Sequence, residues 1–225
     1  MRRRRAAREA RERWVFGPTA PLARALNSQA AMAAITPRVP RVISLLELAP
    51  GRRYLDIGCG TAAYAHLVAA RAGLDEPPVT VDLVAGPGPV ELLGWPEKLP
   101  FRDDSFDAIS SFYFLHRFDD DVTHAFAEEV CRVLAPGGSA LVMDIAPVKS
   151  EWLNRLHLRL LRPGCAQVDL RGWGRLAALF TEVGFDAIDL VNVGPFVFPP
   201  LPRVAVLLRL AKRMPEPAVD LGAEC

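Results

Sequence analysis

Residues 53–66 read Arg-Tyr-Leu-Asp-Ile-Gly-Cys-Gly-Thr-Ala-Ala-Tyr-Ala-His, and this stretch decides the fold. Its apolar run Tyr54–Ile57, with a single acid, is typical of a buried parallel strand. Gly58 permits a sharp turn, and Gly60 lets the backbone come close to a ligand. The alanine-rich run that follows favours a helix, whose first N–H groups lack partners within the helix. Strand, glycine turn and helix together predict a nucleotide-binding site.

Composition and charge exclude several classes of protein. The 225 residues are 51% hydrophobic with a formal net charge of +1, which indicates one folded domain and gives no sign of nucleic-acid binding. The 4 cysteines are scattered without a Cys-x-x-Cys pair, so we expect reduced thiols, no metal site and a cytoplasmic location. No apolar run is long enough to span a bilayer, and charged residues follow Arg2–Arg5 where a signal peptide would be apolar.

The chain divides into three expected parts. Residues 1–48 form a basic helix and lid helices, residues 49–195 the main domain, and residues 196–225 an apolar C-terminal extension with a loose tail. The basic segment 1–13 is either a solvated helix or an arm that faces RNA or a membrane. Apolar residues of the extension occur at both helical and alternating spacing. We expect a helix that includes Val204 and Ala211, because it gathers basic residues towards one side.

Strand and helix patterns alternate through the main domain. This order predicts an α/β fold with a doubly wound, mostly parallel sheet that helices cover on both faces. After the first strand, the expected strands are Val79–Asp82, Val90–Leu93, Ala108–Phe112, Ser139–Ile145 and Phe185–Val193. The expected helices are Ala20–Ile35, Val39–Leu48, Ala62–Ala72, Val122–Leu134, Trp152–Leu161 and Leu170–Val183.

Acids at the ends of predicted elements are candidate functional residues. Asp82 ends a strand 22 positions after Gly60, close to the spacing of about 20 at which an acid binds ribose hydroxyls in glycine-turn folds. The alternative is an ordinary acid at a strand end. Asp119–Asp121 precede a helix, and we interpret them as helix caps because a metal site needs more convergent ligands.

Several segments together resemble the class I S-adenosylmethionine-dependent methyltransferases, and are most similar to the small-molecule type of quinone and natural-product biosynthesis. The segments are Leu55–Thr61, Val81–Asp82, Leu99–Phe101 with Ser105–Asp107, Ser111–His116 and Arg132–Gly138, in the family's order within residues 50–195. The resemblance implies a seven-stranded sheet with a reversed last strand, and S-adenosyl-L-methionine as the cofactor of the main domain. It places Asp56, Gly58 and Gly60 around the methionine end of the cofactor, Asp82 at the ribose and Ser111 near the methyl group. Cys59 and Leu83 are further expected cofactor-binding residues.

The sequence departs from the family's pattern in three places. Ala62 stands where a third glycine is common, which we expect to be a mild change at a helix start. The segment 82–94 is too short for the usual crossover helix, so we expect a more open adenine side. Trp95 and Pro96 replace the usual adenine-binding acid and N–H donor. Trp95 either stacks on the base or packs in the core, and Glu97 could reach the adenine amino group.

Methyl transfer from a sulfonium is an in-line displacement, so alignment and desolvation can suffice without a base. If a base is used, His116 is the candidate, because it follows the strand that ends beside the methyl group and has a suitable ordinary pKa. The alternative is a histidine that packs or caps locally. Apolar residues such as Phe196–Phe198 hint at a small, lipophilic acceptor or weak contact with a membrane surface, although they could simply cover the sheet.

Two other classes of function stay open. A protein with this fold could bind a ligand or partner without transferring a methyl group, which the altered adenine segment makes conceivable. The pattern Gly58-x-Gly60-x-x-Ala63 also fits the dinucleotide fingerprint of a nicotinamide-dependent oxidoreductase. That alternative is weaker, since no tyrosine is followed four positions later by lysine and the downstream segments would be unexplained.

Overall fold

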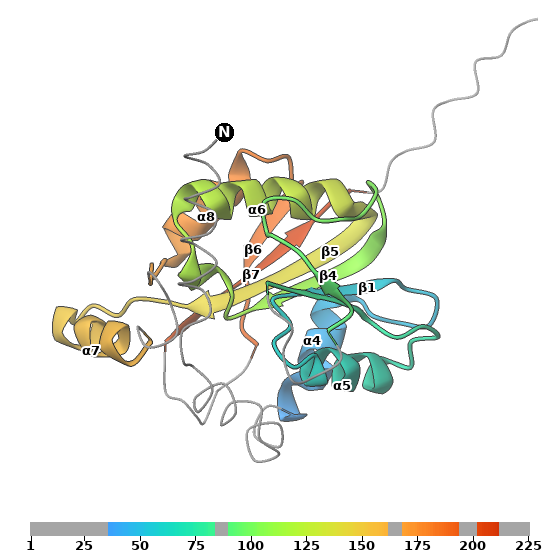
Figure 1. Ribbon diagram of the computed structural model, residues 1–225, viewed down its shortest axis with the longest axis horizontal. Helices are drawn as coiled ribbons and strands as arrows, with labels where there is room; N and C mark the ends of the chain where they lie inside the picture. Colours follow the sequence, from blue (N-terminus) through green and yellow to red (C-terminus); the bar gives the residue numbers. More distant parts are fainter. Residues whose placement is uncertain (1–35, 84–89, 162–167, 194–201, 212–225) are drawn as a thin grey trace, which may run out of the picture.

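The computed structural model describes residues 36–83, 90–161, 168–193 and 202–211 (Figure 1). The helices expected within residues 1–35, the loop 84–89 and the tail after residue 211 lie outside this part of the chain. Its helices are η1 (Thr36–Arg38), α4 (Val39–Leu46), α5 (Ala63–Ala72), η2 (Leu115–Arg117), α6 (Asp120–Val133), α7 (Glu151–Leu161) and α8 (Trp173–Thr181). Its strands are β1 (Tyr54–Ile57), β2 (Val79–Asp82), β3 (Leu92–Leu93), β4 (Phe106–Phe112), β5 (Leu134–Ile145), β6 (Ala187–Leu190) and β7 (Arg203–Arg209).

The described strands form one sheet of seven, in the order β3-β2-β1-β4-β5-β7-β6. Strands β1 to β5 pair in parallel, whereas β7 runs antiparallel to both of its neighbours. This arrangement confirms the expected doubly wound sheet with a reversed last strand. Because the strand order reverses between β1 and β4, the carboxyl ends of these two strands flank the position where such sheets bind ligands.

The expectation of a helix in the C-terminal extension is wrong for residues 203–209. These residues form β7, which lies between β5 and β6 and is buried over most of its length. Val206, for example, pairs with Val142 on one side and with Leu190 on the other. A strand covered on both faces reads as a continuous apolar run, so its own sequence does not separate strand from helix.

Helices cover both faces of the sheet, with α4 and α5 on one face and α6 and α8 on the other (Figure 1). Each face buries its own apolar cluster, one around Phe126 and Phe180 and one around Tyr54 and Leu46. Helix α4 was expected to belong to a lid. The apolar side of α4 packs against α5 and β5, and the role of residues 1–48 as a lid stays a prediction.

Two networks of hydrogen bonds and ion pairs show the structural roles of several residues in the segments that resemble methyltransferases. Arg132 of α6 donates to the Leu99 and Phe101 carbonyls and pairs with Glu129, which holds the loop after β3 against α6. Asp107 accepts hydrogen bonds from the backbone and guanidinium of Arg53, which joins β4 to the start of β1. These residues position loops at the sheet edges. Within the described ranges, no helix is long and apolar enough to cross a bilayer.

Candidate active site

The carboxyl ends of the parallel strands bring most of the predicted site residues to one edge of the sheet. Gly58 follows β1, Leu83 follows β2, Trp95 follows β3 and Tyr113 follows β4. Asp144 lies at the end of β5 on the same edge. The site therefore has a β1–β2 half, which holds the glycine turn, and a β4–β5 half.

Gly58 and Gly60 have positive φ angles of 76° and 59°, a conformation that side chains disfavour. A Cβ added to Gly58 would lie 2.4 Å from the Phe114 ring, so this glycine is needed for packing as well as for the turn. A Cβ added to Gly60 would meet nothing within 4 Å, so open space adjoins the backbone there. The turn is tied to β2 by the Gly58 N–H, which donates to the Val81 carbonyl at 2.8 Å.

Asp82 uses both carboxylate oxygens to hold this turn. Its Oδ2 accepts from the Gly60 N–H at 2.7 Å, and its Oδ1 accepts from the Leu83 N–H at 2.6 Å. The side chain is buried. A carboxylate has about four acceptor positions, which is a chemistry that suits hydrogen bonds from hydroxyl groups. The geometry thus suits the expected ribose role, which stays a prediction.

Asp56 lies in the buried part of β1 and accepts a hydrogen bond from the Ser110 hydroxyl of β4. That hydroxyl also contacts the Tyr54 hydroxyl at 2.7 Å. Burial, opposed by the Ser110 hydrogen bond and assisted by the negative charge of Asp82, raises the pKa of Asp56 to about 7. Burial also raises the pKa of the Cys59 thiol far above its ordinary value, so Cys59 stays a neutral thiol.

The loop after β3 carries the predicted adenine contacts. Gly94 donates its N–H to the Asp82 carbonyl at 3.0 Å, which places Trp95 beside the β1–β2 half. Trp95 is half-buried and forms an isolated antiparallel bridge with Lys98, while Pro96 between them is buried. Glu97 is also half-buried. The roles of Trp95 and Glu97 at an adenine ring stay predictions.

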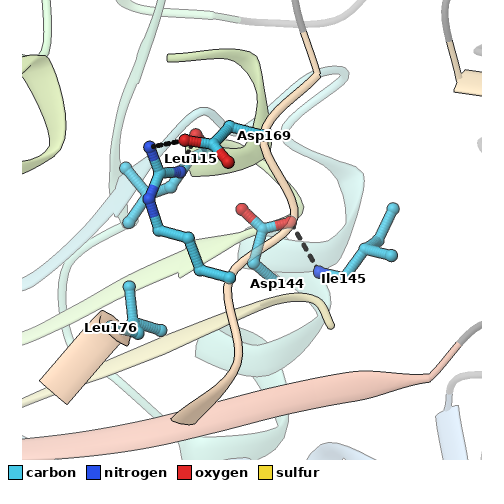
Figure 2. Close-up of a pocket in the computed structure, with 6 residues that line it drawn as sticks. Leu115, Asp144, Ile145, Asp169 and Leu176 are labelled. Atoms are coloured by element: carbon cyan, nitrogen blue, oxygen red, sulfur yellow. Dashed lines mark hydrogen bonds and ion pairs between the residues drawn. The ribbon is translucent and has the colours of Figure 1, made fainter. Parts of the chain in front are cut away.

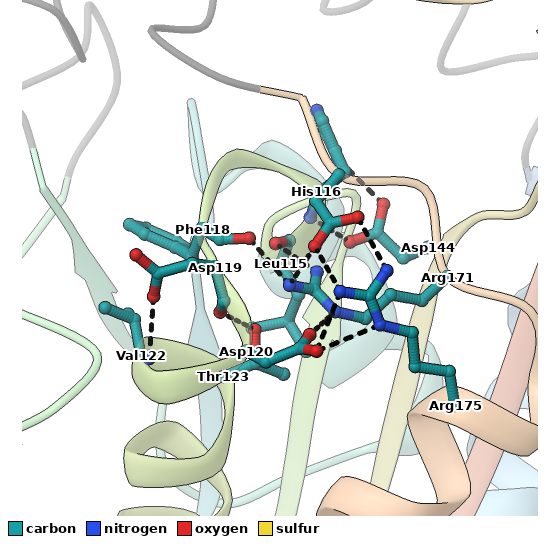
Figure 3. A network of polar contacts seen from close by, with 11 residues as sticks. Leu115, His116, Phe118, Asp119, Asp120, Val122, Thr123, Asp144, Arg171 and Arg175 are labelled. Atoms are coloured by element: carbon teal, nitrogen blue, oxygen red, sulfur yellow. Dashed lines mark hydrogen bonds and ion pairs between the residues drawn. The ribbon is translucent and has the colours of Figure 1, made fainter.

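His116 is the central residue of the β4–β5 half (Figure 3). It is buried in η2, and its Nδ1 lies 2.7 Å from Oδ1 of Asp144. The His116 backbone N–H donates to Oδ2 of the same carboxylate at 2.6 Å, and the Ile145 N–H donates to Oδ1 at 2.7 Å. One buried carboxylate therefore fixes both the main chain and the ring of His116.

Ser111 lies near the carboxyl end of β4, close to the His116–Asp144 pair. It pairs in register with Val142, two residues before Asp144, so Ser111 and Asp144 lie on the same face of the sheet. Its hydroxyl is buried and has no hydrogen-bond partner among the described residues. A buried hydroxyl of this kind normally has a partner, so its position favours a polar ligand at this end of β4.

Sequence reasoning missed the residues that support His116. Asp144 carries a readable signal, because it ends the apolar run of β5 as Asp82 ends β2. The sequence gives no such signal for Asp169 and Arg171, because both residues lie far from His116 in the chain. Asp119 caps α6 as expected and accepts from the Val122 N–H, but Asp120 instead pairs with Arg171 at 2.7 Å.

Figure 2 shows a narrow gap between side chains beside Asp144. The gap has no room for a water molecule, and it is lined by Leu115, Asp144, Ile145, Asp169, Arg171 and Leu176. Asp144 and Arg171 therefore approach the same gap from β5 and from the segment before α8.

Comparison with known proteins agrees with this geometry. Residues 55–142 match the family described as methyltransferase domain. The chain is 34% identical over 131 residues to the human probable tRNA methyltransferase 9B, covering 57% of this chain and 27% of that protein. It is 30% identical over 130 residues to the ubiquinone/menaquinone biosynthesis C-methyltransferase UbiE of Stenotrophomonas maltophilia, covering 51% of each. The chain thus spans about half or less of the curated relatives it matches.

Solved structures share the fold. The YcgJ protein of Bacillus subtilis superposes with a TM-score of 0.62 at 20% identity, covering 78% of this chain and 99% of that one. With the sheet order, the glycine turn and the strand-end acids, these matches define a class of protein. Residues 55–142 match a methyltransferase domain, and the fold is that of the class I methyltransferases.

Methyltransferases of this class use S-adenosylmethionine, and the residues present fit this cofactor. Open space adjoins Gly60, and the Asp82 carboxylate can accept from hydroxyls. Asp56 and Ser111 add polar groups at the ends of β1 and β4. These residues would hold the methionine and ribose ends.

Proposed function

We propose that this protein transfers a methyl group from S-adenosylmethionine to a small acceptor, with His116 as the proton-accepting residue. The observation that carries the proposal is the buried His116–Asp144 pair at the end of β4 and β5, across the switch point from the glycine turn. A cofactor site and a proton acceptor then lie at the same edge of the sheet.

The arrangement of His116 supports a defined tautomer. When Nδ1 carries its proton and donates to Asp144, Nε2 is the nitrogen that accepts one. The cofactor supplies a methyl group on a positively charged sulfur. His116 Nε2 takes the proton as the acceptor's O–H bond breaks, and Asp144 stabilises the imidazolium that forms. The acceptor oxygen would take the methyl group that the bound cofactor supplies, with a neutral thioether as the leaving group.

The acceptor class rests on the enclosed position of His116 and on the net charge of +1. Both favour a small, lipophilic phenol or enol over a polyanion. The relative named UbiE supports a quinone-like acceptor, whereas the relative named as a tRNA methyltransferase supports RNA. Of these we propose the small molecule. The cytoplasmic location and the weak membrane contact also stay predictions.

Calorimetry tests the cofactor part of the proposal. We expect S-adenosylmethionine and S-adenosylhomocysteine to bind and NAD not to bind. Binding of NAD alone would favour an oxidoreductase. Failure of all three ligands to bind would favour a protein that binds a partner without methyl transfer.

Transfer of a radiolabelled methyl group tests the acceptor. The substrates are a panel of phenols and quinols, with bulk tRNA in parallel. We expect label on a small phenol or quinol, and His116→Gln and Asp144→Asn to lower turnover while cofactor affinity is retained. Label on tRNA alone contradicts the acceptor class, and full turnover by both variants contradicts the role of His116.

A further inference from the structure

Arg171 holds the loop that carries His116 (Figure 3). Its Nη1 donates to the Leu115 carbonyl at 3.2 Å, and its Nη2 donates to the Phe118 carbonyl at 2.7 Å. The Leu115 carbonyl lies within η2 just before His116, and the Phe118 carbonyl lies just after η2. The Arg171 side chain is only 3% exposed, so its hydrogen bonds form away from bulk water.

The same short segment also touches His116 directly. The Asp169 N–H donates to the His116 carbonyl at 2.8 Å. The His116 N–H is held by Asp144 from the end of β5. The main chain of His116 is therefore fixed by β5 at its N–H and by residues 169–171 at its carbonyl.

Two carboxylates balance the buried charge of Arg171. Its Nε donates to Asp120 at 2.7 Å, and its Nη2 donates to Asp169 at 2.9 Å. Arg175, whose side chain is 50% exposed, bridges the same two carboxylates from the outside. No hydrogen bond from Arg175 to the His116 loop occurs among the described residues, so the two arginines share partners but differ in that contact.

We propose that Arg171 is a positioning residue for the His116–Asp144 pair, and the inference rests on the proposed function. Its guanidinium fixes the η2 backbone on both sides of His116. This backbone sets the orientation of the His116 ring, and so of Nε2, the nitrogen that accepts the proton in the proposed function. Asp144 and Arg171 also line the same narrow gap between side chains.

The chemistry explains why an arginine stands here. A guanidinium has five N–H donors in a planar fork, and Arg171 directs them to two carbonyls and two carboxylates at once. A lysine has three donors on one nitrogen and cannot span these four acceptors. Arg171→Lys therefore keeps the charge and removes most of the positioning.

The test compares Arg171→Met and Arg171→Lys with the matched control Arg175→Met. Protein labelled with ¹⁵N in its 4 histidines gives the ring signals, and His116→Gln assigns the signal of His116. In the native protein we expect His116 to hold the Nδ1-protonated tautomer. Both Arg171 variants should mix the two tautomers and shift the midpoint of the His116 titration. Arg175→Met should leave the signal unchanged.

The inference is overturned if the His116 signal of a folded Arg171 variant matches the native protein, or if Arg175→Met changes it equally. Arg171→Lys keeps the test available should Arg171→Met fail to fold. Measuring the affinity for S-adenosylhomocysteine separates the two proposals. A native protein that does not bind it contradicts the proposed function. The ring signal of His116 still tests the role of Arg171 in that case. With an acceptor in hand, we expect kcat to fall by about 10- to 100-fold with KM for the cofactor unchanged.

Discussion

The two halves of the site are built in different ways. The β1–β2 half consists of backbone and one carboxylate, and its central residues, Gly58 to Gly60, are contiguous and join directly to Asp82 at the next strand. The β4–β5 half consists of side chains from η2, β5, α6 and the segment before α8, held together by buried ion pairs. The first half depends on local conformation, and the second depends on the whole fold.

This difference determines how each half can fail. A side chain added to a glycine turn strains the backbone, and the loss of stability is confined to the turn and the residues that contact it. A buried ion network fails when one partner is removed, because the remaining charges lose their compensation. The following changes test whether the two halves behave separately.

Gly58→Ala should have the largest effect, because it affects both halves. The new Cβ would lie 2.4 Å from Phe114, which precedes the His116 loop, and φ at position 58 is +76°. Strain and overpacking together should lower the free energy of unfolding by about 2–5 kcal/mol, measured by urea denaturation. Gly60→Ala is the control, since open space adjoins it and only strain of about 1–2 kcal/mol applies. Equal losses in the two variants would show that Phe114 does not join the halves.

Asp56→Asn should change how stability depends on pH. The pKa of Asp56 is raised to about 7 from 3.8, so between these values the folded state binds more protons than the unfolded state. The contribution of Asp56 to stability therefore falls as pH rises from about 4 to 7, by at most about 4 kcal/mol at 1.36 kcal/mol per pKa unit. Asp56→Asn should lose this dependence and be the more stable protein at pH 8. Parallel stability curves at pH 4.5 and pH 8 would contradict the raised pKa.

Asp82→Ala should weaken cofactor binding without affecting the other half. It removes the acceptor of the Gly60 and Leu83 N–H groups, each of which donates to a charged carboxylate. Affinity for S-adenosylhomocysteine should fall by about 10- to 100-fold, measured by calorimetry. The ring signal of His116 should stay unchanged, and Asp144→Asn should show the opposite pattern. A shifted His116 signal in Asp82→Ala would show that the halves are coupled.

Ala62→Gly should give the smallest effect, a gain in stability. Ala62 caps α5 with φ at +60°, so the departure from the family's glycine is strained rather than neutral. Glycine relieves about 1–2 kcal/mol of this strain but removes a buried methyl group that contributes about 0.8 kcal/mol, which leaves a gain of up to about 1 kcal/mol that thermal unfolding can detect. Ala70→Gly, at an exposed position inside α5, should instead lose about 1 kcal/mol. A loss of stability in both variants would contradict the strain.

Much of the fold was predictable because its strands have local signals. Tyr54–Ile57 and Val79–Asp82 form strands with the expected bounds, since each is a short apolar run that a turn or an acid ends. The helix expected over Leu170–Val183 begins only at Trp173. The preceding residues stay outside the helix, where Arg171 reaches η2 and Asp120. Ion pairs with distant residues decided that boundary.

The site was predictable to the same degree. Gly58, Gly60 and Asp82 could be proposed because the turn and the acid lie at a characteristic spacing, and the structure brings them into contact. His116 could be proposed only from its place after a strand. Its partner Asp144 is 28 positions away, and Arg171 reaches its loop from 53 and 56 positions away. No periodicity or spacing links residues at such separations.

The sequence by itself determined the alternation of strand and helix, the glycine turn and the acid that follows β2, because each depends on residues close together in the chain. Only the tertiary structure decided that Arg203–Arg209 is a strand. Its apolar run is compatible with a helix or a strand, and pairing with β5 and β6 supplies the backbone hydrogen bonds of a strand. The tertiary structure also assembled His116, Asp144 and Arg171. Their buried charges and hydrogen bonds are satisfied only when distant segments meet.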